Sequence, residues 1–250
     1  MTRARILMFA DGAIGRQLAR LALAYDPTLI CGIVSLPGSG ASAHLAQEFS
    51  VPHVAYDAQR TKAVVEQTRS LAANIVMLVW WPVILPREFL SLGQHVTLNL
   101  HPSLLPHARG KDPNFWTIVE GVPFGVTIHH VTPQIDAGDI AFQREIAYSW
   151  EDTGESLYRK AVEAMIGLFQ DSYPRIASFD IPRRPQEVTK ATFHRRKELD
   201  ARSLISLDES YTARALLNLL RARTFEPHDA CRFVENGETY EVRVSIRRKQ

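Results

Sequence analysis

Short apolar runs alternate with segments of helical periodicity through the first 100 residues of the chain. Each run is short enough for a strand, whereas the segments between them repeat apolar residues every three or four positions, as an amphipathic helix does. Strands that alternate with helices favour a parallel sheet with helices on both faces, and right-handed crossovers order such a sheet. The sequence therefore predicts an α/β fold with a Rossmann-like, mostly parallel sheet. We expect strands at 5–10, 29–35, 53–55, 74–79 and 95–100, and helices at 16–24, 41–49 and 58–70.

The pattern changes after residue 100. Two further strands and one long helix complete the first domain, and Pro174, Pro182 and Pro185 mark its end. The sequence predicts a domain over residues 1–185, followed by a small C-terminal subdomain over residues 186–250. The additional strands are expected at 125–131 and 139–147, and the helix at about 152–172.

The C-terminal subdomain is expected to be a small α+β appendage. Residues 211–221 have helical periodicity, and Asn236-Gly237 predicts the turn of a β-hairpin, because both residue types tolerate positive φ. Apolar residues then alternate with polar ones from Tyr240 to Ile246, which is typical of a half-buried strand.

Charge is unevenly placed, although the whole chain has a net charge of only +2. Residues 1–182 hold 14 Lys and Arg against 17 Asp and Glu, a net of −3, and residues 183–250 hold 15 against 10, a net of +5. The basic tail is open to two interpretations, an anionic partner such as a phosphate or nucleic acid, or an ordinary solvated surface.

The N-terminal apolar run ends at Asp11, which is too early for a signal peptide, and no segment is as long as a membrane span. We therefore expect a cytoplasmic protein without a membrane partner. The two cysteines, Cys31 and Cys231, lack the C-x-x-C spacing of a zinc knuckle or a redox motif.

Glycines follow the first expected strand, as in many nucleotide-binding folds. Gly12-Ala-Ile-Gly15 is not the G-x-G-x-x-G fingerprint, and no acidic residue ends the second strand. A dinucleotide site of the NAD type is therefore not expected. A helix that begins after a glycine turn can still hold a substrate phosphate, so Gly12 is a candidate substrate-binding residue.

Polar residues gather where the central strands end, which is where open α/β sheets place their sites. Asn99 and His101 lie two positions apart on one strand and should share a face. Asp136 follows a later strand, and Gly138 permits a tight turn beside it. This trio suits acyl transfer, since a His can accept a proton, an Asn can donate to an oxyanion and a carboxylate can orient the His. The alternative is hydrogen-bonded core residues and an Asp in a turn.

Four histidines lie close together in sequence and raise the question of a metal site. His129 and His130 should face opposite sides of a strand, and neither cysteine nor paired ligand spacing accompanies them or the other two. We therefore expect no metal. The other two histidines are His101 and His107.

The ordered motifs Asn99-x-His101-Pro-Ser-x-Leu-Pro106, Gly125-Val-Thr-x-His129 and Asp136-x-Gly138-Asp-Ile140 resemble those of the folate-dependent formyltransferase family. That family includes glycinamide ribonucleotide, methionyl-tRNA and nucleotide-sugar formyltransferases. The resemblance implies that Asn99, His101 and Asp136 are catalytic, that the co-substrate is N10-formyltetrahydrofolate, and that Leu105-Pro106 is a cis peptide. It also implies that the pterin pocket is built largely from the backbone of two loops, over residues 80–85 and 131–136. The residues expected to bind the co-substrate are Trp81, Val83, Leu85, Thr132, Asp136 and Gly138.

The segment Arg109-Gly-Lys-Asp-Pro-Asn-Phe-Trp116 bears on the acceptor. Methionyl-tRNA enzymes have Arg-Gly-Ala-Ala-Pro here, whereas this segment is similar to enzymes that formylate amino groups on nucleotide-linked dideoxy sugars. We therefore expect acceptor binding by Arg109, Lys111 and Asn114, in addition to Gly12. Phe115 and Trp116 either stack on the sugar or base or only pack a helix.

The function predicted is N-formyl transfer to a nucleotide-linked amino-dideoxy sugar, such as GDP-perosamine or a dTDP-amino sugar, in O-antigen or other surface-polysaccharide synthesis. The tail is short for the barrel of tRNA enzymes and differs from the family at Pro227-His-Asp-Ala-Cys231. Alternatives are a methionyl-tRNA formyltransferase-like enzyme, a formyltetrahydrofolate hydrolase, whose N-terminal regulatory domain is not expected here, and a catalytically silent binding domain. The resemblance further implies a homodimer, and no nucleic-acid partner is expected.

Overall fold

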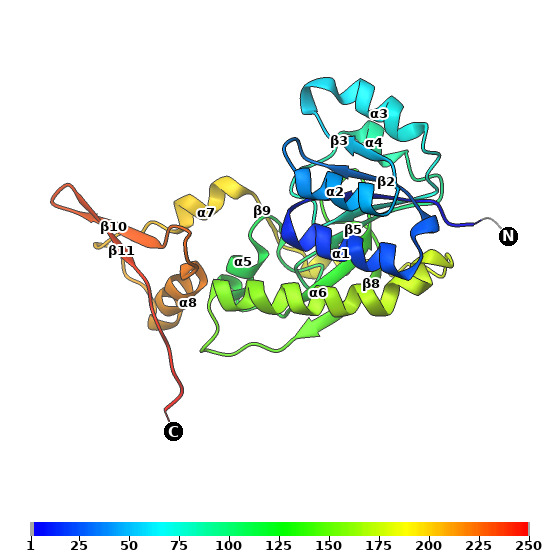
Figure 1. Ribbon diagram of the computed structural model, residues 1–250. Helices are drawn as coiled ribbons and strands as arrows, with labels where there is room; N and C mark the ends of the chain where they lie inside the picture. The colour runs from blue at the N-terminus through cyan, green and yellow to red at the C-terminus, as the bar shows by residue number, and fades with distance from the viewer. Residues whose placement is uncertain (1–2, 250) are drawn as a thin grey trace. The chain divides into compact units, whose positions relative to one another are not determined.

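The computed structural model describes residues 3–249, which form two compact units (Figure 1). The first unit runs to His101 and also contains Ile128–Phe142 and Ile166–Pro185. The second contains Pro102–Thr127, Gln143–Met165 and the chain from Gln186 onward. The second unit therefore joins the C-terminal part of the chain to two earlier segments. The domain boundary at residue 185 stays a prediction.

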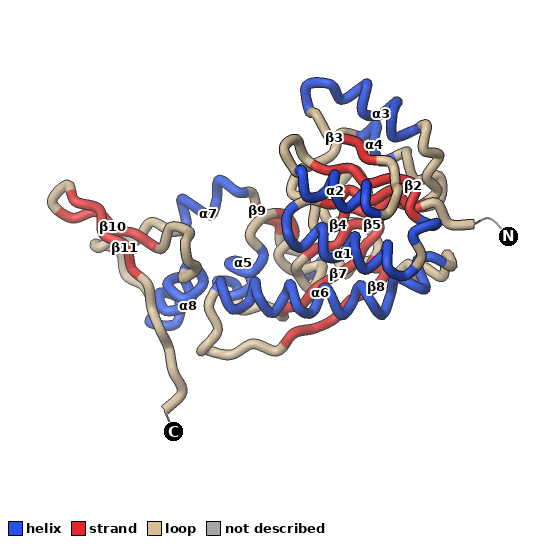
Figure 2. Tube along the Cα trace, viewed as in Figure 1, coloured by secondary structure: helices blue, strands red, loops and turns tan. Residues whose placement is uncertain are grey.

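A seven-stranded sheet in the order β3-β2-β1-β4-β5-β7-β8 carries the fold (red in Figure 2). Neighbouring strands from β3 to β5 pair in parallel. All five residues of β1 and of β4 are buried, as expected for strands that are covered on both faces. The predicted Rossmann-like α/β fold is confirmed. The strands are β1 (Ile6–Ala10), β2 (Ile30–Ser35), β3 (His53–Ala55), β4 (Ile75–Val79), β5 (Val96–His101), β7 (Phe124–His130) and β8 (Ile140–Ile146).

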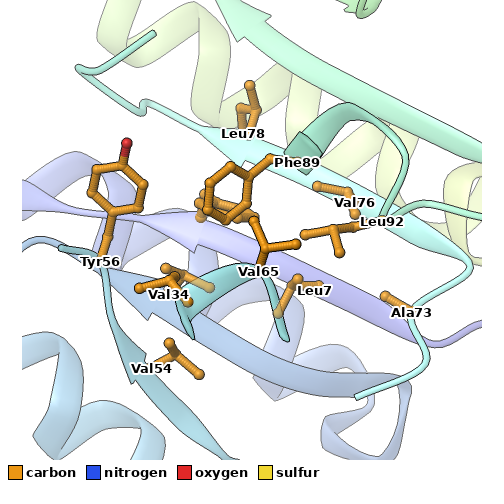
Figure 3. Packing of buried hydrophobic residues seen from close by; sticks show 12 residues of the cluster. Leu7, Val34, Val54, Tyr56, Val65, Ala73, Val76, Leu78, Phe89 and Leu92 are labelled. Atoms are coloured by element: carbon orange, nitrogen blue, oxygen red, sulfur yellow. The ribbon is translucent and has the colours of Figure 1, made fainter. Parts of the chain in front are cut away.

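One cluster of buried side chains fills the space between the sheet and two helices (Figure 3). Leu7 and Val76 come from β1 and β4, Val65 comes from α3, and Phe89 comes from α4 and is fully buried. The apolar runs that predicted strands are therefore the residues that hold these helices to the sheet. The helices of the structure are α1 (Gly12–Tyr25), α2 (Gly40–Glu48), α3 (Thr61–Arg69), α4 (Arg87–Leu90), α5 (Pro113–Glu120), α6 (Gly154–Ala177), α7 (Arg196–Arg202) and α8 (Ala213–Arg223), with 3-10 turns at Pro27–Leu29, Ala58–Arg60 and Val188–Lys190.

Helix α1 begins four residues earlier than predicted, at Gly12. Its first turn carries two glycines and so lacks the apolar periodicity that marks the rest of the helix. Gly12 has a positive φ of 66° that makes the turn out of β1. A Cβ at Gly15 would lie 3.0 Å from the carbonyl oxygen of Val79, so this glycine lets α1 approach the sheet closely.

Helix α6 also differs from the prediction, because it continues through Pro174 to Ala177. A proline close to the end of a helix removes only one backbone bond, so Pro174 does not end the helix. Leu105-Pro106 is a cis peptide, as the resemblance implied.

The C-terminal hairpin has the predicted turn, since Asn236 and Gly237 both have positive φ, at 51° and 81°. Its strands are β10 (Cys231–Glu235) and β11 (Glu238–Val242). The predicted extension of β11 to Ile246 is wrong. Val242 pairs with Cys231, the first residue of β10, so the partner strand provides no ladder beyond that point. Over the range 3–249, no helix is long and apolar enough to cross a membrane.

Candidate active site

Asn99 and His101 project from the end of β5 towards the same carboxylate, that of Asp136 in the loop between β7 and β8. Asn99 Nδ2 donates to Asp136 Oδ1 over 3.3 Å, and His101 Nδ1 lies 3.6 Å from Asp136 Oδ2. All three belong to the first unit. The alternation of strand side chains therefore brings the predicted trio together.

Asp136 lies in an unusual backbone conformation, with a φ of 51°. Left-handed backbone at a residue other than glycine is uncommon and is typical of functional sites that the surrounding structure holds in place. Two residues further on, any Cβ at Gly138 would overlap the carbonyl oxygen of His130. The glycine is required because the loop returns against β7 at this point, and this return turns the Asp136 carboxylate inward.

His129, at the end of β7, is a fourth member of the site that was not predicted to act there. It is only 2% exposed, and its Nε2 lies 3.1 Å from Asn99 Nδ2 and 3.4 Å from Asp136 Oδ1. Its Nδ1 lies 2.9 Å from the carbonyl oxygen of His130 and must donate to it, because a carbonyl only accepts. The other nitrogen can then accept from the Asn99 amide and fix its orientation. In the sequence, the feature that could have identified His129 as a site residue is its place at the end of the Gly125-Val-Thr-x-His129 motif.

The Asp136 carboxylate is a buried charge that two imidazoles and one amide surround. The side chains of Asp136 and His101 are 9% and 7% exposed. A buried carboxylate is stable only when it is paired or hydrogen-bonded, and the same carboxylate favours a proton on a neighbouring imidazole. The separation of 3.6 Å between His101 and Asp136 is longer than a normal hydrogen bond, so it can shorten when His101 takes up a proton. This arrangement suits general acid–base chemistry at His101.

The loop after β4 turns three predicted co-substrate residues towards the protein interior. Trp81, Val83 and Leu85 pack against the buried cluster of Figure 3, and the Trp81 ring meets Phe9 edge to face at 5.4 Å. Ile84 between them is 66% exposed. The exposed side chains of this loop are therefore Pro82 and Ile84, which sequence reasoning did not single out.

The loop that carries Asp136 also presents an exposed apolar side chain, Ile135, at 41%. Thr132 is exposed in the same loop, and its hydroxyl donates to the carbonyl oxygen of Gln134 over 3.0 Å. Two loops of the first unit thus each carry an exposed isoleucine.

The residues predicted to bind the acceptor lie in both units. Gly12 is exposed at the start of α1, in the first unit. Arg109 and Lys111 belong to the second unit, where Nε and Nη2 of Arg109 donate to Gln186 Oε1 over 3.1 and 2.7 Å. Asn114 donates from Nδ2 to the carbonyl oxygen of Gly154 over 2.8 Å, and this bond ties α5 to the start of α6.

Phe115 and Trp116 pack inside the second unit and are only 2% and 7% exposed. Their rings meet edge to face at 5.0 Å. Of the two interpretations of this pair, the structure therefore favours helix packing over stacking on a sugar or base.

Among residues 3–249, no group of three or more His, Cys, Asp and Glu side chains is placed to hold a metal ion. His129 and His130 point to different partners, since His130 Nε2 lies 2.8 Å from the carbonyl oxygen of Pro182.

Comparison with known proteins gives two family matches in chain order. A family model described as formyl transferase matches residues 27–169, and one described as N-formyltransferase dimerization C-terminal domain matches residues 198–248. Together they cover most of both units.

Solved structures with the same fold include a sugar N-formyltransferase from Shewanella, with a TM-score of 0.80, 20% identity and 99% coverage of both chains. A 4-N formyltransferase from Francisella tularensis has a TM-score of 0.79 at 18% identity, over 98% of this chain and 99% of that one. An N-formyltransferase from Helicobacter canadensis, solved with folinic acid and dTDP-3-aminofucose, has a TM-score of 0.69 at 18% identity, over 95% of this chain and 85% of that one. At these identities the likeness establishes the fold.

Proposed function

Since the chain belongs to the formyl transferase family, we propose that it moves a formyl group from N10-formyltetrahydrofolate to the amino group of a nucleotide-linked amino-dideoxy sugar. The observation that carries this proposal is the buried contact of His101 and Asn99 with Asp136 at the end of β5. This set supplies a base, an amide donor and a carboxylate within one site, as acyl transfer to an amine requires.

His101 takes the proton of the attacking amine as the new C–N bond forms. Protonated His101 and the amide of Asn99 then stabilise the oxyanion, since the long bond from Asn99 to Asp136 is one that an oxyanion can replace. Asp136 offsets the charge on His101 and assists proton movement to the folate nitrogen as the bond between that nitrogen and the formyl carbon breaks. His129 holds the Asn99 amide in place throughout.

The residues present fit a folate. The backbone of residues 80–85 would hold the polar edge of its pterin, and Ile84 and Ile135 would contact its apolar surface. Trp81 Nε1 is buried with no hydrogen-bond partner among the described residues. When bound, the folate supplies the activated formyl group. The folinic acid in the Helicobacter canadensis enzyme supports this assignment.

The acceptor carries a diphosphate, which favours binding by Arg109 and Lys111. Gly12, at the exposed start of α1 in the first unit, is proposed separately, because a helix N-terminus can hold a phosphate oxygen. Asn114 also remains a proposed acceptor residue, through the side-chain hydrogen-bonding groups that its bond to Gly154 does not use. The dTDP-3-aminofucose in the Helicobacter canadensis enzyme supports this class of acceptor. A role in O-antigen or other surface-polysaccharide synthesis, and a cytoplasmic location, complete the proposal.

The proposed function is tested by supplying N10-formyltetrahydrofolate with GDP- and dTDP-linked 3-amino and 4-amino dideoxy sugars and detecting the formamido product by mass spectrometry. Formylation of at least one of these amines is expected. Formylation of methionyl-tRNA alone, or hydrolysis of the folate with no acceptor consumed, would show that the sugar assignment is wrong.

Lys111→Ala is expected to raise the KM for the nucleotide-linked sugar about tenfold, because a charge-assisted bond to phosphate is lost. The KM for the folate should stay within about twofold. Lys62→Ala on α3, where the side chain is exposed, is the matched control and should change neither constant. Equal effects of the two substitutions would remove Lys111 from the acceptor site.

We also propose that the protein is a homodimer that uses the C-terminal hairpin, as the match to a dimerization domain over residues 198–248 supports. Val234 and Tyr240 are 54% and 47% exposed, and Tyr240 stacks on Phe233 at 5.2 Å across the hairpin. A second chain would cover this apolar surface.

Tyr240→Glu is expected to shift the protein to a monomer in sedimentation velocity, because a charge at the interface would lose its water without gaining a partner. Val188→Glu changes an even more exposed apolar residue outside the matched range, at 75% exposure, and should leave the mass unchanged. A Tyr240→Glu protein that remains dimeric would place the interface elsewhere.

A further inference from the structure

The segment from Ala108 to Asp112 has an unusual backbone. Ala108, Gly110 and Asp112 all have positive φ, at 49°, 91° and 55°. Two of the three are not glycine, and such residues leave the left-handed region unless neighbouring structure holds them there. The segment includes Arg109 and Lys111, so whatever holds this backbone also holds the proposed acceptor-binding residues.

A segment far along the chain lies against this loop and bonds to its backbone. β6 (Arg109–Gly110) pairs in parallel with β9 (Phe193–His194). Arg109 N donates to the carbonyl oxygen of Thr192 and Lys111 N donates to that of His194, each over 3.0 Å. Any Cβ at Gly110 would overlap the His194 carbonyl, so the contact is as close as two backbones allow.

The side chain of His194 fixes β9 in turn. Its Nε2 lies 2.5 Å from Glu120 Oε1 on α5, and its Nδ1 lies 3.2 Å from Glu198 Oε2 on α7. Both nitrogens therefore face carboxylate oxygens, which only accept hydrogen bonds. The ring stacks on Trp116 with centroids 3.6 Å apart and planes 6° from parallel.

Thr192 adds a second link to the same carboxylate. Its hydroxyl donates to Glu120 Oε2 over 2.9 Å and accepts from the backbone N of Ala108 over 2.9 Å. Glu120 therefore holds the last residue of β9 and the residue just before it, and the His194 side chain is only 14% exposed within this network.

We infer that His194 is a positioning residue for the acceptor, which keeps Arg109 and Lys111 in their binding conformation through the β6–β9 contact. This inference rests on the proposed function, in that the nucleotide-linked sugar is the ligand of that loop. The folate loops, over residues 80–85 and 131–136, lie in the first unit and are not among the contacts given above, so we expect the effect to fall mainly on the sugar.

The test compares His194→Ala with His194→Phe, which keeps a ring to stack on Trp116 but loses both hydrogen bonds. Both variants are expected to raise the KM for the sugar tenfold or more, because apparent affinity falls with the fraction of molecules whose loop is competent to bind. The KM for the folate and kcat should change by less than about threefold. His44→Ala, at an exposed position on α2, is the control. A purely structural role would lower Tm without this separation of the two KM values.

Hydrogen exchange measures the stability of the β6–β9 backbone contact in the absence of substrate. The amides of Arg109 and Lys111 should exchange at least tenfold faster in His194→Phe than in the wild type. Unchanged exchange of these amides would overturn the inference. If the wild-type protein formylates the sugar, an unchanged KM for the sugar in the His194 variants would overturn it as well. A third outcome is that the wild type formylates no amino sugar while exchange is faster in His194→Phe. In that case the proposed function and the acceptor role of His194 are both wrong, but the effect of His194 on the backbone contact is supported.

Discussion

His101→Asn is expected to lower kcat about 100-fold or more, in line with the loss of a general base. Asparagine keeps a polar side chain of similar reach but cannot accept the proton of the attacking amine. It also cannot carry the positive charge that Asp136, 3.6 Å away, would stabilise. Because the proton transfer occurs only in the transition state, kcat and kcat/KM for the sugar should fall together. Single-turnover formylation of a nucleotide-linked amino sugar measures the effect on chemistry directly.

The matched control is His95→Asn, the same substitution six positions upstream, just before β5. His95 is exposed, and its ring packs edge to face on Phe179 at 5.2 Å. This variant should turn over at the wild-type rate. Turnover of His101→Asn within about threefold of the wild type would exclude a proton-transfer role for His101 and leave Asp136 as the remaining candidate base.

The sheet was predictable from sequence because its strands are buried on both faces. Ile6–Ala10 and Ile75–Val79 are continuous apolar runs, so they stand out without any partner information. The formyl transferase family and the enzyme class were also predictable, since the motifs around His101 and Asp136 occur in order, and both predictions are confirmed by the match over residues 27–169.

Elements that depend on distant contacts were not predictable. Helix α5 begins inside a motif assigned to substrate binding, and its Trp116 packs on His194, which lies 78 positions later in the sequence. β9 has only two residues and exists because it pairs with β6. Such short segments carry no periodicity, so only the folded chain reveals them.

Within the site, the alternation of side chains along a strand was sufficient to place Asn99 and His101 on the same face. It was not sufficient to identify His129 as a member of the site. Strand alternation alone does not choose between the two adjacent histidines on β7 as partners of Asp136, and only the motif that ends at His129 marks one of them. The choice follows from the loop between β7 and β8, whose left-handed Asp136 faces His129 rather than His130. A loop conformation of this kind is set by long-range packing, which explains why Gly138 was predicted to permit a turn but its contact with His130 was not.

Gly138→Ala is expected to lower kcat about 100-fold, although position 138 provides no side chain to the reaction. The new Cβ would overlap the carbonyl oxygen of His130, so this carbonyl or the loop must move. The same carbonyl accepts from Nδ1 of His129, whose Nε2 contacts Asn99 and Asp136. Displacement of catalytic groups by about 1 Å can cost 100-fold in rate, and this chain of contacts transmits such a shift to two of the three residues proposed to be catalytic.

Gly40→Ala separates this positioning effect from the general cost of replacing a glycine. Gly40 is exposed at the start of α2, and a Cβ there meets nothing within 4 Å, so activity should be unchanged and Tm should be equal or slightly higher. For Gly138→Ala, a cooperative unfolding transition shows that the protein is folded when its rate is measured. If such a folded protein turns over as the wild type does, the loop absorbs the added methyl group without moving Asp136. The close approach of Gly138 to β7 would then serve the stability of the loop, and the orientation of the carboxylate would depend on its own contacts, such as those with Asn99 and the two histidines.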